Sequence, residues 1–152
     1  NYSTMTTSLQ TKKDIETRVA GWVKTYADTI TENYRRYHVE TLEGNLSGKY
    51  PEYAQQQLDE IKNGTANLMW FKVYSGKKYY KIVYQTFDED ENRFRNGSVH
   101  CFIDKKTGEV YKAASWQNPA KHVRYDMRII KDREFLHNPD NIDWAGGHLY
   151  MR

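Results

Sequence analysis

The spacing of apolar residues changes once along the chain, and this change limits the folds that the chain can adopt. From Ile15 to Tyr37, apolar residues recur every three or four positions, which is the period of a helix with one buried face. From Met69 to Ala114, they alternate with polar residues, which is the period of half-buried strands. A chain with helices first and strands afterwards is typical of an α+β fold, in which helices cover one face of an antiparallel sheet.

The first predicted helix carries one long apolar stripe. Thr11 and Asp14 resemble a capping box, which favours a helix start, and Gly44 favours an end just after Leu42. A helix of roughly thirty residues is about 45 Å long, so it can lie diagonally across a whole sheet. The stripe consists of Ile15, Val19, Trp22, Val23, Tyr26, Ile30, Tyr34 and Tyr37.

A second helix and four strands are predicted after the first helix. Pro51 suits the first turn of the second helix, and Gly64 suits its end. Gly108 favours a tight turn between the last two strands. The predicted strands cover residues 69–74, 78–87, 98–104 and 110–114 in meander order, and a longer loop over residues 88–97 separates the second from the third.

The apolar pattern weakens after Trp116. Pro119, which follows Asn118, predicts a short helix through Arg128, and residues 147–152 predict a last strand. Neither a repeat nor a low-complexity linker occurs, which indicates a single domain over residues 1–152. We therefore predict an α+β fold in which two helices pack on one face of a curved antiparallel sheet of four to five strands. This arrangement resembles the cystatin-like and nuclear-transport-factor-2-like architectures, a resemblance that implies no functional residues.

Charge, cysteine content and the absence of long apolar runs bear on where the protein is located. The formal net charge is +3, and the single cysteine, Cys101, excludes an intramolecular disulfide. No apolar run approaches the ~20 residues of a membrane span, and residues 1–10 lack the features of a signal peptide. We therefore expect a cytoplasmic protein with no membrane partner.

Motifs for metal or nucleophilic chemistry are missing from the sequence. The five histidines show no metal-site spacing, and the acidic run 88–91 lacks the glycine-punctuated spacing of a calcium loop, so it is predicted to be a solvated loop tip. His100 and Cys101 are neighbours in a predicted strand, where adjacent side chains point to opposite faces, and this excludes them as a nucleophilic pair. We therefore predict no metal and no cofactor, and we predict that Cys101 is a core residue.

The sheet face that points away from the helices is the main candidate for function. Rings interleaved with lysines there suit base stacking and phosphate neutralisation on a single-strand-binding sheet. The same surface suits a homodimer, and it also suits cover by the carboxy-terminal segment. The residues predicted on this open face are Trp70, Lys72, Tyr74, Tyr79, Lys81, Gln85, His100 and Phe102. The residues predicted to face the helices are Met69, Phe71, Val73, Tyr80, Ile82, Tyr84, Val99, Cys101 and Ile103.

A basic stretch follows the predicted strands. Between Lys112 and Arg133, six Lys or Arg residues stand against two aspartates, which gives a local charge of +4. Such a stretch suits contact with phosphate, although a solvated helix face has the same composition. The candidate contact residues in this stretch are Lys121, Arg124 and Arg128.

Three stretches of the carboxy-terminal half form a recognisable set. They are VHCFIDKKTGEVYK at 99–112, the pieces SW, PAK and RY that begin at positions 115, 119 and 124, and DWAGGHLY at 143–150. Together they resemble small uncharacterised proteins of tailed bacteriophages, including marine ones. This resemblance implies a bacteriophage origin and a location in the host cytoplasm, and it transfers no site residue.

These patterns favour a non-enzymatic binding or assembly protein that forms a homo-oligomer, most simply a dimer, through the open face and the basic stretch. The alternative is a single-stranded nucleic-acid-binding module that uses Trp70, Lys72, Tyr74, Tyr79 and Lys81. A third hypothesis is a small-molecule enzyme with a pocket between helix and sheet. No motif in the sequence names a reaction or a ligand.

Overall fold

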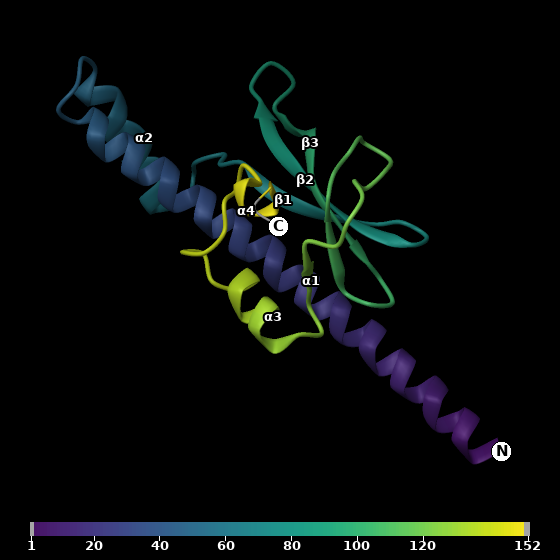
Figure 1. Cartoon of the computed structure of the whole chain (residues 1–152). Helices are drawn as coiled ribbons and strands as arrows, with labels where there is room; N and C mark the ends of the chain where they lie inside the picture. Colours follow the sequence, from purple (N-terminus) through teal and green to yellow (C-terminus); the bar gives the residue numbers. More distant parts are fainter. Residues whose placement is uncertain (1, 151–152) are drawn as a thin grey trace.

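The computed structural model describes residues 2–150, with side chains from Thr11 onwards. It confirms the α+β prediction, because two amino-terminal helices pack on an open, five-stranded antiparallel sheet (Figure 1). The elements in chain order are α1 (Tyr2–Asn45), α2 (Pro51–Asn63), β1 (Trp70–Ser75), β2 (Tyr79–Asp88), β3 (Arg93–Asp104), β4 (Glu109–Lys112), β5 (Tyr125–Asp126), α3 (Ile130–Leu136) and α4 (Gly147–Tyr150).

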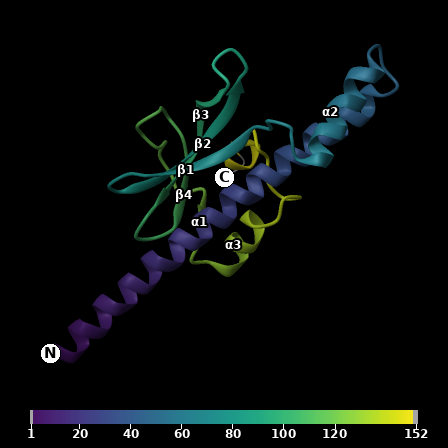
Figure 2. The ribbon, with the colours of Figure 1, turned by 180° about the vertical axis from the view of Figure 1, so that it is seen from behind.

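The long helix α1 runs the length of the molecule. Its 44 residues span about 66 Å at 1.5 Å per residue, and it begins before the predicted start and continues through Gly44. In Figures 1 and 2 the sheet lies beside its middle part, and its first turns extend past the sheet. The middle part carries the predicted stripe, of which Val19, Val23, Tyr26 and Ile30 are fully buried, whereas Tyr37 near the end of the helix is exposed.

The second helix, α2, folds back along the end of α1 (Figure 1). Pro51 occupies its first turn as predicted, and Gly64 ends it in the left-handed conformation with a φ of 81°. Its Ala54 is buried, whereas Tyr53 is exposed. No helix within residues 2–150 combines the length and the apolar composition that a membrane span requires.

The sheet is a meander with the strand order β1-β2-β3-β4-β5, as predicted for its first four strands. The pair formed by β2 and β3 extends into the predicted loop at 88–97, because Gln85 pairs with Asn96 and the pairing continues to Arg93. The loop between these strands is therefore limited to residues 89–92.

A β-bulge in β3 changes which side chains face α1. Ile82 pairs with Cys101 and Val83 pairs with Val99, so His100 is an inserted residue. The insertion turns both His100 and Cys101 toward α1 and leaves Val99 on the opposite face. The prediction that His100 lies on the open face and that Val99 faces the helices is therefore wrong. It assumes strict alternation, which holds only in a strand without an inserted residue.

The segment after β4 is extended, whereas the sequence predicts a helix there. The amides of Ala120 and Arg124 donate to the carbonyl oxygens of Lys112 and Val110, both at 2.7 Å. The segment thus continues the edge of the sheet and ends in β5. Pairing with that edge satisfies backbone groups, and this tertiary effect outweighs the local helix signal of Pro119.

The carboxy-terminal residues form a short helical turn, α4, and the predicted last strand is wrong. Met151 and Arg152, which that prediction includes, lie outside the described residues. His148 and Leu149 are both buried. A helical turn lets these two neighbours reach the interior together, whereas a strand would send them to opposite faces.

Candidate functional site

Polar aromatic side chains form a buried hydrogen-bond network, the inner network, between α1 and the sheet. The amide of Asp143 donates to Nδ1 of His148 at 3.0 Å, so this nitrogen carries no proton. Nε2 of His148 then donates to the hydroxyl of Tyr26 at 2.6 Å. Nε2 of His100 donates to the carbonyl oxygen of Asp143 at 3.2 Å. Because its Nδ1 accepts an amide, His148 is fixed as the neutral tautomer with the proton on Nε2, whereas Nδ1 of His100 is buried without a hydrogen-bond partner.

Burial keeps the groups of this inner network neutral. It lowers the pKa of His100 to about 4 and, together with the repulsion that a protonated His100 would exert, lowers the pKa of His148 to about 3. It also raises the pKa of the Cys101 thiol. The bulge places His100 and Cys101 on one side, contrary to the prediction, but a buried and protonated thiol is a core residue and not a nucleophile.

The side chains of the inner network are closed off from solvent. Tyr26 and Cys101 are 0% exposed, and His100 and His148 are 4% and 6% exposed. The hydroxyl of Tyr84 donates to the carbonyl oxygen of Trp144 at 2.8 Å, and burial raises the pKa of Tyr84 to about 12. These groups hold the carboxy-terminal segment against α1, and a ligand from solvent does not reach the buried histidines.

The opposite face of the sheet has the aromatic and basic character that the sequence predicts. The register places Tyr74 beside Lys81, and Lys81 beside Phe102. The rings of Tyr79 and Phe102 meet edge to face with centroids 5.9 Å apart. Phe102 and Gln85 are buried beneath their neighbours. We name this surface the outer face and define it by Trp70, Lys72, Tyr74, Tyr79, Lys81, Phe102 and Tyr111.

The lysines of the outer face contact rings rather than carboxylates. Nζ of Lys72 lies 4.8 Å from the ring centroid of Tyr74, within cation–π range. Within residues 11–150, every ion pair closer than 4.0 Å uses an arginine. Glu109, at the edge of the outer face, lies 3.8 Å from Arg128. The outer face therefore presents uncompensated positive charge beside aromatic rings.

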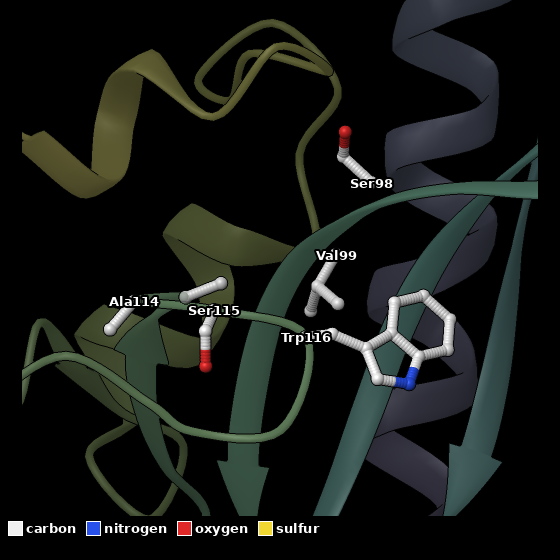
Figure 3. Close-up of a pocket in the computed structure, with 6 residues that line it drawn as sticks. Ser98, Val99, Ala114, Ser115 and Trp116 are labelled. Carbon is white, nitrogen blue, oxygen red and sulfur yellow. The ribbon is translucent and has the colours of Figure 1, made fainter.

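The loop after β4 covers part of the outer face. Nζ of Lys81 donates to the carbonyl oxygen of Trp116 at 3.1 Å and lies 3.9 Å from the centroid of its ring. Figure 3 shows the Trp116 indole in front of the strands with Val99 nearby, at a cavity of about 310 Å³. Residues 113–119 provide this cover. The carboxy-terminal segment, which the sequence offers as a possible cover of the open face, packs on the inner side instead.

Beside the Trp116 loop, the outer face is hollowed into a groove of about 380 Å³. Trp116 and Gln117 come from a loop, where no periodicity marks a residue as functional, and the sequence prediction misses both. An isolated Trp directly after a predicted strand is the one signal that points to them. The groove is lined by Tyr74, Ser75, Gly76, Lys77, Lys78, Tyr79, Lys81, Phe102 and Gln117.

The candidates of the basic stretch differ in their surroundings. The guanidinium of Arg128 contacts both carboxylate oxygens of Asp126, at 2.7 and 3.0 Å, so its charge is matched. Arg124 is half-buried beside β4, and Lys121 is exposed. The stretch thus divides its charge between structural contacts and solvent, and we place the candidate site on the outer face.

The acidic run lies at a loop tip, as predicted, and two arginines, Arg93 and Arg95, offset part of its charge. Arg95 lies 3.2 Å from Asp88 and 3.3 Å from Glu91. Asp88 also accepts hydrogen bonds from the amides of Asp90 and Glu91. Among the side chains of residues 11–150, no three His, Cys, Asp or Glu residues form a group suited to a metal ion.

Comparisons with known proteins identify a family but no activity. No curated protein and no solved structure matches the chain, so the likeness to cystatin-like folds and to bacteriophage proteins stays a prediction. A family model matches residues 2–151, which is nearly the whole sequence. The chain therefore belongs to the family of unknown function DUF7717.

Proposed function

We propose that the protein binds single-stranded nucleic acid on its outer face. The observation that carries the proposal is the combination of accessible rings with lysines that no carboxylate neutralises. Bases stack on aromatic rings, and ammonium groups beside those rings neutralise the phosphates that follow each base. A surface of this composition is sequence-tolerant, because every base offers a flat face.

Two rings from different elements are accessible here: Tyr79 lines the groove, and Trp116 lines the neighbouring cavity of about 310 Å³. Trp116 is 43% exposed and belongs to the loop after β4, while Tyr79 is half-buried at the start of β2. Lys81 lies between them, with its ammonium group on the Trp116 ring. Two stacked bases contribute about 2–6 kcal/mol of the roughly 8 kcal/mol that micromolar binding requires, and lysine–phosphate contacts would supply the rest.

Fluorescence anisotropy of a labelled oligothymidylate tests this proposal. We expect wild-type binding that weakens about tenfold in Tyr79→Ala, because one stacking ring is lost. Tyr150→Ala is the matched control, because Tyr150 is an exposed tyrosine of α4, 69% exposed, and does not line the groove. Equal affinities for wild type and Tyr79→Ala would refute the proposal, as would an equal loss in both variants.

Self-association is a second proposal, and it rests on the other end of the molecule. The end of α1, the connection to α2 and the start of α2 expose large apolar side chains, which mark interaction surfaces when they gather. They are Tyr37, Leu46, Tyr50 and Tyr53. Light scattering at micromolar concentration should give the mass of a dimer, and the mass of a monomer would remove this proposal.

A further inference from the structure

Four lysines gather at the end of the sheet where two turns meet. Lys77 and Lys78 belong to the turn between β1 and β2, and Lys105 and Lys106 belong to the turn between β3 and β4. The amide of Lys105 donates to the carbonyl oxygen of Lys78 at 3.1 Å, which ties the two turns together. Like charges are thereby held close on a fixed backbone, which costs electrostatic energy unless an anion binds there.

These lysines border a second hollow, which we name the lysine cleft. It has a volume of about 510 Å³, and its other lining residues are Glu16 of α1 and Asp104. Lys77 and Lys78 line both the lysine cleft and the groove of the outer face, so the two hollows share a wall. A flexible chain that leaves the groove over this wall enters the lysine cleft directly.

The acidic neighbours offset only half of the charge of the lysine cleft. The Asp104 carboxylate accepts the amides of Lys106 and Thr107, at 2.8 and 3.2 Å, and so serves its own turn. Glu16 is exposed on α1, and Lys12 lies one helical turn before it. With four lysines and two carboxylates the lining carries a net charge of +2.

The contacts of Lys105 are with neutral groups. Its ammonium group donates to the hydroxyl of Ser75 and lies 4.9 Å from the ring centroid of Tyr80. Nζ of Lys78 lies 5.3 Å from the ring centroid of Tyr79. These contacts orient the ammonium groups without cancelling their charge, as a backbone-phosphate site requires.

We infer that the lysine cleft binds phosphates of the same single strand whose bases stack in the groove. This inference rests on the proposed function and deepens it, because it gives the ligand a path. The bases lie on the outer face, the backbone crosses Lys77 and Lys78, and the next phosphates lie against Lys105 and Lys106. A strand long enough to span both hollows therefore binds more tightly than a strand that fills the groove alone.

Oligonucleotide length separates the two hollows experimentally. Labelled oligothymidylates of about 4 and about 16 nucleotides cover the range of site sizes of small single-strand-binding domains, and oligouridylates of equal length compare RNA with DNA. In K105Q/K106Q, we expect the long strand to bind about tenfold more weakly and the short strand to bind as in wild type. The slope of log K against log salt for the long strand should fall by about 1.4, because two phosphate contacts are lost at about 0.7 each.

The double variant K62Q/K131Q is the matched control, because it removes two exposed lysines from α2 and α3. It should leave both affinities unchanged. An equal loss in this control, or unchanged long-strand binding by K105Q/K106Q, would overturn the inference. If Tyr79→Ala still weakens the short strand in that case, the proposed function stands. If no strand binds the wild-type protein, both proposals are wrong.

Discussion

The inner network and the outer face use similar side chains in opposite ways. On the inner side, Tyr26 and His148 bind each other at 2.6 Å, and burial keeps these groups neutral. On the outer face, Tyr79 and Trp116 lie beside lysines whose charge no nearby carboxylate matches. A polar group with its partners in place stabilises the fold, whereas a charged group without one is available to a ligand.

Substitutions in the inner network should mainly lower the free energy of unfolding. His148→Ala removes the bonds to Tyr26 and to the Asp143 amide and leaves a cavity, so the free energy of unfolding should fall by about 3 kcal/mol. Urea denaturation followed by circular dichroism measures the change. Lys72→Gln on the outer face is the comparison variant, with an expected change below about 0.5 kcal/mol. Similar losses of unfolding free energy in the two variants would contradict this difference between the inner network and the outer face.

Stability should also depend on pH through the two inner histidines. Their pKa values in the folded protein, about 4 for His100 and about 3 for His148, lie below the ordinary value near 6.5. The unfolded chain therefore binds more protons as the pH falls below 6.5, so this stabilisation is complete above pH 6.5 and is lost toward pH 4.

Between pH 7 and pH 5, before most carboxylates titrate, the loss should be on the order of 2–4 kcal/mol. Urea denaturation at several pH values measures it. His148→Gln, which cannot take up a proton in this range, should show about half of the dependence. A free energy of unfolding that stays constant over this range would show that the histidines are not held neutral.

Substitutions on the outer face should lower the affinity for a single strand more than they lower stability. Trp116→Ala removes a ring that contacts Lys81 and is 43% exposed, so the free energy of unfolding should fall by only about 1 kcal/mol. The affinity for an oligothymidylate should fall about tenfold, since one stacking partner is lost. Thermal unfolding and anisotropy on the same sample measure both effects. Loss of stability with unchanged affinity would assign Trp116 to the fold instead.

The sequence predicts the sheet faces well where strands are regular. In β1 and β2, strict alternation holds, so Lys72, Tyr74 and Lys81 lie where the pattern places them. In β3 the insertion of His100 exchanges the faces of Val99 and His100 relative to the prediction. The sequence Val99-His100-Cys101 does not indicate this bulge, because a bulge depends on the register with a neighbouring strand.

The carboxy-terminal third is poorly predicted for a related reason. Its extended segment follows the edge of β4, and its α4 turn is fixed by the contacts of His148 with distant residues. Local propensity cannot anticipate such partners, because they come from other parts of the chain. The lysine cleft is hidden in the same way, since its lysines are nearly thirty positions apart and meet only through two turns.

The salt dependence of oligothymidylate binding by the wild-type protein shows whether lysines of the outer face and the lysine cleft hold the phosphates of a single strand. Affinity measured by anisotropy across a series of salt concentrations should give a slope of about −2 to −3 in log K against log salt, from three or four lysine–phosphate contacts at about 0.7 each. A single strand should also bind more tightly than a duplex of equal length, whose bases cannot stack on rings. Binding that does not respond to salt, or no binding at low salt, would contradict the proposal that the outer face binds single-stranded nucleic acid.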